Sequence, residues 1–91
     1  KVSMGTIAAR DCLRVIELTE QVVAAMLIAA RQGVALRQRM TPSRGVEGDV
    51  GVMLEDLIAR IALVEEDRAL DHDLRRLLDD VRTQRWSLYD Y

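Results

Sequence analysis

The chain has little of several residue types, and each shortage excludes a class of protein. Its 91 residues include no phenylalanine, one proline, one histidine and one cysteine. Because Cys12 has no second cysteine to join, the chain can form no internal disulfide and no cysteine-based metal site. The longest apolar run, residues 22–30, is far shorter than the roughly 20 residues that a membrane-spanning helix needs. With no signal-peptide pattern at its start, the sequence predicts a cytoplasmic protein that does not enter a membrane.

The charge and the composition narrow the class further. A net charge of −2 and an isoelectric point near 5.3 argue against nucleic acid or an anionic membrane as the main partner. Hydrophobic residues make up 49% of the chain and charged residues 31%, and alanine and leucine are abundant. A chain of this length forms at most one small domain. We expect an all-α fold: one long central helix over about 4–37, a loop over 38–49, and two shorter helices over about 50–64 and 72–83.

The first expected helix has an unusual distribution of apolar residues. Ser3 and Thr6 are both suitable N-caps. One stripe at spacings of three, four and one is formed by Ala8, Cys12, Val15, Ile16, Thr19, Val22, Val23, Met26, Leu27, Ala30 and Val34. Residues 22–30 offer no polar side chain in any direction, which is typical of a helix buried on all sides. This favours a core helix of a larger bundle or oligomer; a three-helix bundle with this helix at its centre is the simpler alternative.

The two later helices have ordinary amphipathic patterns. Asp49 and Asp71 are their expected caps. Their expected buried residues are Val50, Met53, Leu54, Leu57, Ile58 and Ile61 in the second helix and Leu74, Leu77, Leu78 and Val81 in the third. Two i,i+4 pairs are expected on the third helix, Arg75 with Asp79 and Arg76 with Asp80. Pro42 marks a turn in the loop. No internal repeat or coiled-coil heptad of useful length is evident.

Residue types that often carry chemistry are isolated in this sequence. His72 stands in the first turn of a charged helix without a second histidine or cysteine at metal-ligand spacing, so we interpret it as a solvated helix-end residue. Cys12 falls within the apolar stripe, which predicts a small buried hydrophobic residue. The carboxylates of Glu65, Glu66, Asp67, Asp71 and Asp73 lack the ligand spacing and glycine of a calcium loop. We expect no metal site.

Three short motifs resemble one enzyme family. They are Val2, Ser3, Met4, Gly5 and Thr6 followed by Ala8, Ala9 and Arg10; then Ala29, Ala30, Arg31, Gln32, Gly33 and Val34; and finally residues 66–74, which contain an Asp-Arg pair followed by two further aspartates. In order and spacing they are similar to the C-terminal region of histidine ammonia-lyase and its relatives, the aromatic amino acid ammonia-lyases and 2,3-aminomutases. Residues 41–52 match nothing specific.

The resemblance implies a nearly all-α, homotetrameric enzyme that eliminates ammonia from histidine or an aromatic amino acid. Its electrophile is a methylidene-imidazolone group that forms from an internal Ala-Ser-Gly. Because this sequence contains no Ala-Ser-Gly, and because it begins at Lys1 without an initiator methionine, we expect it to be the C-terminal segment of a larger enzyme. Its expected partners are the rest of that enzyme, other subunits and a small amino acid substrate.

The resemblance also limits which residues can lie at an active site. The family's catalytic tyrosine lies far upstream, so Tyr89 and Tyr91 are not its counterparts and no catalytic residue is expected in the chain. The candidates for the active-site wall are Lys1, Val2, Ser3, Met4 and Gly5. Ser3 would start a helix whose positive end favours developing negative charge. Lys1 replaces the histidine common at that position in histidine lyases, which counts against histidine as the substrate.

The alternative function, from another class of protein, is a free-standing helical interaction module or an inactive truncated homologue. The missing initiator methionine and the all-round apolar segment count against both. The sequence leaves open whether the larger enzyme is a lyase or an aminomutase.

Overall fold

The computed structural model describes residues 2–40 and 48–89, and in these ranges the protein is all-α. Helix α1 spans Val2–Met40, α2 spans Gly48–Arg60 and α3 spans Asp71–Arg82, and a short 3₁₀ helix, η1, follows over Ser87–Tyr89. This confirms the predicted class, in which one long helix is followed by two shorter ones. Residues 41–47, which include the predicted turn at Pro42, lie outside the described residues.

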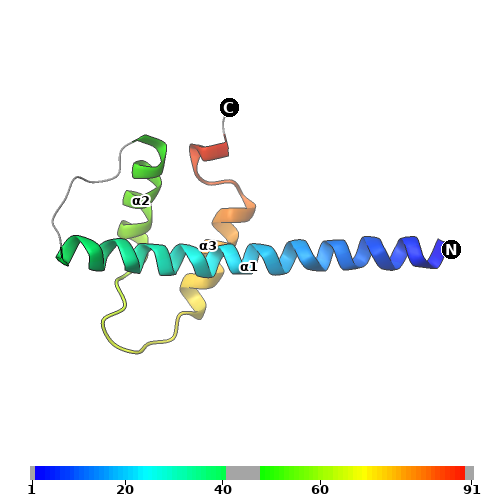
Figure 1. The fold of residues 1–91 in the computed structure, drawn as a ribbon, viewed down its shortest axis with the longest axis horizontal. Coiled ribbons are helices and arrows are strands. Elements are labelled where there is room, and N and C mark those ends of the chain that lie inside the picture. Colours follow the sequence, from blue (N-terminus) through cyan, green and yellow to red (C-terminus); the bar gives the residue numbers. More distant parts are fainter. Residues whose placement is uncertain (1, 41–47, 90–91) are drawn as a thin grey trace.

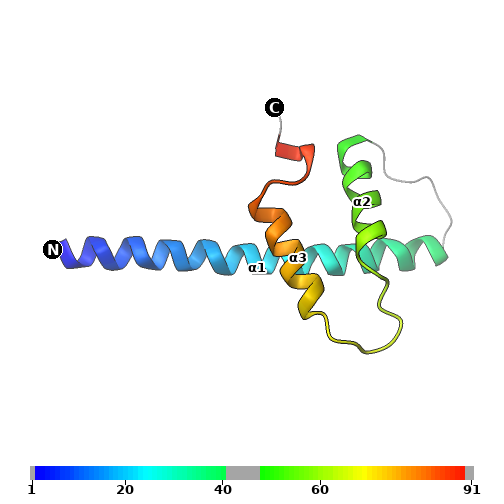
Figure 2. The same ribbon diagram turned by 180° about the vertical axis from the view of Figure 1, so that it is seen from behind.

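Helix α1 sets the length of the molecule. Its 39 residues should extend about 58 Å at 1.5 Å per residue, and the largest extent of the molecule is 59 Å. Helices α2 and α3 cross the C-terminal half of α1 on one side of it, behind α1 in Figure 1 and in front of it in Figure 2. The N-terminal half of α1 projects beyond them without a neighbour in either view.

The core is small and lies where the three helices meet. Its buried residues are Ala24 and Ile28 of α1, Leu57 of α2, Ile61 just after α2, Leu77 of α3 and Trp86 near η1. Because alanine has so small a side chain, Ala24 lets α3 approach α1 closely, and it is only 1% exposed. Leu74, Leu78 and Val81 of α3 pack against this cluster, as their spacing predicts.

Two polar side chains of α1 hold the connection between α2 and α3. Arg31 is buried, and its Nε donates to the backbone oxygen of Ile61 at 2.9 Å. Gln32 bonds the backbone of Val64 twice: its Nε2 donates to the oxygen at 2.7 Å, and its Oε1 accepts from the nitrogen at 2.9 Å. Backbone N–H and C=O groups at a helix end lack helical partners and need other hydrogen-bond partners when they are buried from water. The side chains of the Arg31-Gln32 motif therefore replace helical hydrogen bonds at this point.

The helix boundaries differ from the predicted ones at several ends. Helix α1 continues to Met40 instead of stopping near residue 37, because Gln38, Arg39 and Met40 all have high helix propensity. Helix α2 spans Gly48–Arg60 instead of 50–64, since Arg31 and Gln32 capture the Ile61 and Val64 backbone groups that a longer helix would use. Helix α3 spans Asp71–Arg82, one residue earlier at each end than predicted.

The predicted caps are not caps in the structure. Asp71 is the first residue of α3; Leu70 precedes it as the N-cap, without a side-chain capping bond. Asp49 lies inside α2, and Ser3 and Thr6 lie inside α1, which begins at Val2. Asp49 and Asp71 still stand in first turns, where a negative charge complements the helix dipole. The side chain of Ser3 lies outside the described residues.

Helix α1 uses a different face from the predicted one. The buried residues of α1 are Ala24, Ile28 and Arg31, whereas most of the predicted stripe, including Cys12, is exposed. In α2, likewise, Leu57 is buried but Ile58 is 41% exposed. The prediction failed for α1 because its C-terminal half is apolar on both sides, so spacing alone could not show which side α3 would cover.

Candidate functional site

The predicted active-site wall lies at the free end of α1. The N-terminus stands at the far end of the molecule from α2 in Figures 1 and 2. Met4 is 71% exposed, and apart from the adjoining residues and the local helix backbone no atom lies within 4 Å of where a Cβ on Gly5 would be. Lys1 and the side chains of Val2 and Ser3 lie outside the described residues. The described part of the chain therefore forms no pocket at this end, and the assignment of residues 1–5 to a wall stays a prediction.

One electrostatic property of this end is nevertheless defined. The first turn of α1 contains no acidic residue, so no carboxylate of that turn offsets the partial positive charge of the helix N-terminus. Gly5 leaves the backbone accessible from one side. Such an end suits an anion or a group that develops negative charge.

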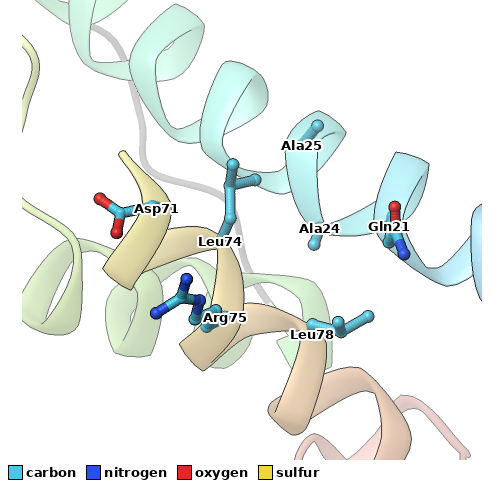
Figure 3. A pocket seen from close by; sticks show the side chains of 7 residues that line it. All are labelled: Gln21, Ala24, Ala25, Asp71, Leu74, Arg75 and Leu78. Carbon is cyan, nitrogen blue, oxygen red and sulfur yellow. The ribbon is translucent and has the colours of Figure 1, made fainter. Parts of the chain in front are cut away.

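A hollow of about 460 Å³ lies between α1 and α3. Figure 3 shows Leu74 and Leu78 projecting from α3 beside Ala24, Ala25 and Gln21 of α1. Asp71 and Arg75 complete its lining. The floor is mostly aliphatic, and no nucleophile or paired acid and base lines it. Its chemistry is that of a packing groove, not of a catalytic site.

The strongest cluster of polar contacts joins α2 to the end of the chain. Asp56 accepts from Arg85 Nε at 2.9 Å and from Trp86 Nε1 at 3.0 Å. The hydrogen bond from Arg85, followed by the bond from Trp86 and the nearby guanidinium charges, lowers the pKa of Asp56 to about 2 against the opposing effect of burial. The same bond raises the pKa of Arg85. The carboxylate of Asp56 thereby fixes the aromatic end of the chain on α2.

The backbone after α3 turns to make these contacts possible. Gln84 has a φ of 52°, in the left-handed region that side chains rarely adopt. Its nitrogen donates to the oxygen of Val81, and the nitrogen of Arg85 donates to that of Asp80. The turn brings Arg85 and Trp86 back toward α2. A second hollow, of about 370 Å³, lies there and is lined by Asp49, Val52, Met53, Asp56, Arg85, Trp86 and Ser87.

A second ion pair in this cluster corrects a predicted one. Asp80, which is 5% exposed, accepts hydrogen bonds from Nη1 and Nη2 of Arg60, at 2.5 and 3.3 Å. The predicted Arg76–Asp80 pair is therefore wrong: Asp80 faces α2, and Arg76 donates to the backbone oxygen of Arg60 at 3.1 Å. Sequence reasoning missed this cluster. The available signals were the i,i+4 spacing of Asp56 and Arg60 and the need of a buried tryptophan N–H for a partner.

The other predicted positions are dispersed. His72 is exposed in the first turn of α3. Asp73 binds Arg68 at 2.7 Å, and Glu65 binds Arg39 at 2.7 Å. Within residues 2–40 and 48–89, no group of three or more histidine, cysteine or acidic side chains is placed to hold a metal ion. None of the helices described is both long and apolar enough to cross a membrane.

Comparison with known proteins gives the family. Residues 1–62 match the family described as "Aromatic amino acid lyase". The chain is 36% identical over 78 residues to a histidine ammonia-lyase of Gloeobacter violaceus, an alignment that covers 86% of this chain and 14% of that protein. No solved structure matches. The chain thus spans about one seventh of the length of this relative, and it belongs to the aromatic amino acid lyase family.

Proposed function

We propose that the chain is the C-terminal helical part of an ammonia-lyase that acts on histidine or an aromatic amino acid. In that enzyme, a cytoplasmic homotetramer, it contributes core packing, subunit contacts and one edge of the active site. One observation carries the proposal. The chain aligns with only 14% of a histidine ammonia-lyase. The exposed apolar side chains of α1 support the same proposal.

The exposed side chains of α1 support a role in a larger assembly. Leu13 is 64% exposed, Val22 56% and Met26 63%. Large exposed apolar surfaces on a soluble protein mark interfaces. We infer that the remainder of the enzyme or other subunits cover this part of α1.

The prosthetic group must come from elsewhere in the enzyme. The family resemblance implies a methylidene-imidazolone, which forms from Ala-Ser-Gly, and this sequence has no such tripeptide. The group supplies the electrophile that activates the amino acid for elimination. No described side chain of this chain forms a pocket for it, so no step of the reaction is assigned to these residues.

The contribution to the active site is assigned to residues 1–5. An N-terminal first turn without an acidic residue and a glycine that permits close approach suit the place where negative charge develops during elimination. Replacing Ser3 by alanine in the full enzyme should lower turnover and leave the unfolding transition nearly unchanged. Unchanged turnover would remove Ser3 from the site.

The choice of substrate rests on two opposing observations. The similar protein is named a histidine ammonia-lyase, but Lys1 departs from the histidine common at that position in histidine lyases. Both classes of substrate therefore belong in the test, together with the corresponding β-amino acids that an aminomutase would form.

The test compares the 91-residue chain with the polypeptide encoded by its complete reading frame. We expect the reading frame to contain Ala-Ser-Gly upstream and its product to release ammonia from histidine, phenylalanine or tyrosine. The 91-residue chain alone should release no urocanate, cinnamate or coumarate. A reading frame without Ala-Ser-Gly would overturn the proposal in favour of an interaction module or an inactive homologue, and activity of the 91-residue chain would also overturn it.

A further inference from the structure

The side of α1 that faces away from α2 and α3 carries a heptad stripe of uncharged residues, which was not evident in the sequence before the covered side of the helix was known. If Gly5 is an a position, every a and d position from residue 5 to residue 40 is uncharged and exposed in the structure. The a positions are Gly5, Cys12, Thr19, Met26, Gly33 and Met40, and the d positions are Ala8, Val15, Val22, Ala29 and Leu36. We call these a and d positions the seam. In a chain with 31% charged residues, such an uncharged seam is typical of a helix that packs along another helix.

The contacts within the chain use the opposite side of the same helix. Ala24 and Arg31, which are buried, occupy f positions, and Leu27 and Ile28, which also contact the core, occupy b and c positions. The flanking positions Ile16, Leu18, Val23 and Ala25 are apolar too, and this is why the seam is hidden in the sequence. Only after the covered side is known does the free side become distinct.

We propose that this free side packs against the same side of α1 in a second copy of the chain, with the two helices antiparallel and Cys12 opposite Leu36 of the second copy. The proposal rests on the subunit contacts that the proposed function assigns to the chain. It adds the surface, the direction and the register of one of those contacts.

The sizes of the residues favour the antiparallel direction. In antiparallel coiled coils an a residue meets a d residue of the partner, and steric fit at these layers selects the pairing. The layers of the proposed register pair Ala8 with Met40, Cys12 with Leu36, Val15 with Gly33, Thr19 with Ala29, and Val22 with Met26. Most layers thus join a small residue to a larger one. A parallel pair would instead join Met26 to Met26 and Gly33 to Gly33, which gives alternating crowding and gaps.

The charges at the edge of the seam favour the same register. Asp11 and Arg39 are the charged residues at g positions, and the antiparallel register places Asp11 of each copy beside Arg39 of the other. Arg39 is 58% exposed and binds Glu65 through one nitrogen, so its guanidinium has donors left for a second carboxylate. A parallel pair would instead bring the basic C-terminal turns of both helices together, with Arg37 and Arg39 in each.

The length of the seam is sufficient for a specific contact. Residues 8–40 would overlap fully in the antiparallel pair, over about 50 Å at 1.5 Å per residue. A strip of that length and about 10 Å in width on each helix buries on the order of 1,000 Å² in total, which is where specific interfaces begin.

Cysteine cross-linking tests the direction and the register. The variant Leu36→Cys should form a covalent dimer on mild oxidation, because Cys12 and position 36 meet in the proposed layer. The control Gln38→Cys places its thiol at an exposed f position on the other side of α1, and it should cross-link roughly tenfold less because a disulfide needs closely approaching Cα atoms. An intrachain bond is impossible in Leu36→Cys, since 24 residues of one helix separate the thiols by about 36 Å.

The wild-type chain provides the complementary measurement. It should sediment as a dimer yet form little Cys12–Cys12 disulfide, because the antiparallel register holds the two Cys12 residues apart. Val22→Asp on the seam should shift the chain to monomer at concentrations where Val52→Asp, a similarly exposed valine of α2, leaves the dimer intact. Circular dichroism checks that both variants remain helical.

Three results would overturn the inference: a monomeric wild-type chain, an efficient Cys12–Cys12 bond, or equal cross-linking of Leu36→Cys and Gln38→Cys. A monomeric chain would mean that another helix of the enzyme covers the seam. None of these readouts depends on catalysis, so a full-length enzyme that releases ammonia while its 91-residue part stays monomeric would refute the inference and leave the proposed function standing.

Discussion

At the scale of single residues, Asp56 does the most to hold the end of the chain in place. Its carboxylate accepts from Arg85 and Trp86 and lies 3.6 Å from Arg60. The contacts reach across about 30 residues of sequence, and this explains why no local pattern predicted them. The i,i+4 spacing of Asp56 and Arg60 could be seen in the sequence. The turn at Gln84 that returns Trp86 to α2 could not, because its left-handed backbone occurs at a residue other than glycine.

Asp56→Asn should loosen this end of the chain. The variant keeps the size of the side chain but loses the charge that Arg85 and Trp86 bind, and hydrogen bonds to a charged group contribute about 1.5–3 kcal/mol. Because Asp56 is partly exposed, we expect about 1 kcal/mol lower free energy of unfolding at pH 7, measured by urea denaturation with Trp86 fluorescence. Glu55→Gln, a neighbouring exposed carboxylate on α2, serves as the control and should change little.

The pH dependence provides a second check on Asp56. Its pKa is about 2 in the folded chain and near 3.9 in an unfolded one. A lowered pKa stabilises the fold above the unfolded value, and the contribution disappears as the pH falls through the folded value. The difference between wild type and Asp56→Asn should therefore shrink from pH 4 toward pH 2. A difference that stays constant over this interval would assign it to packing instead of charge.

At the scale of helices, the sequence patterns predicted that three helices form, but they did not predict which faces of those helices contact one another. Spacings of three and four residues were enough to predict three helices in order, because amphipathic periodicity is a local property. Which face of α1 would be covered was not predictable, since Val22 and Met26 on one side are as apolar as Leu27 and Ile28 on the other. Arg31 and Gln32 belong to a motif recognised in the sequence. Their hydrogen bonds to the backbone after α2 could not be predicted, because the connection they bind lies about 30 residues away in the chain.

Arg31→Met should destabilise the connection between α2 and α3. Methionine retains much of the buried aliphatic stem but leaves the backbone oxygen of Ile61 without the donor it has in the wild type, and an unsatisfied buried acceptor costs about 1–3 kcal/mol. We expect a lower melting temperature and faster amide hydrogen exchange over residues 61–70. Arg10→Met, at an exposed position of the same helix, should change neither. Equal effects of the two substitutions would refute the role of Arg31.

At the scale of the whole molecule, the two ends of α1 differ in packing: the C-terminal half is covered by the other helices and the N-terminal half is not. Its C-terminal half has a core of six buried hydrophobic residues, while its N-terminal half presents Met4, Ile7 and Leu13 to solvent. A domain of this size has little surplus stability, so an uncovered apolar helix is better explained by assembly than by isolated folding. The proposed site at residues 1–5 could be predicted only as a position in a family motif, because no described side chain forms a pocket at that end of α1.

Ala29→Leu separates folding of the chain from assembly. Ala29 is exposed on α1, and leucine is nearly as good a helix former as alanine, so the unfolding transition measured on dilute, monomeric chain should stay within about 0.5 kcal/mol of the wild type. In the antiparallel pair, Ala29 meets Thr19 in a layer of two small side chains, where added methylene groups crowd both helices and overpacking costs about 1–3 kcal/mol. The dimer dissociation constant from sedimentation should rise by about 5- to 150-fold.

Ala59→Leu, which adds the same side chain to an exposed position of α2, should leave that constant unchanged. If Ala29→Leu and Ala59→Leu dissociate alike, close packing does not occur on this side of α1, and its apolar residues must be covered by a partner that approaches from another direction.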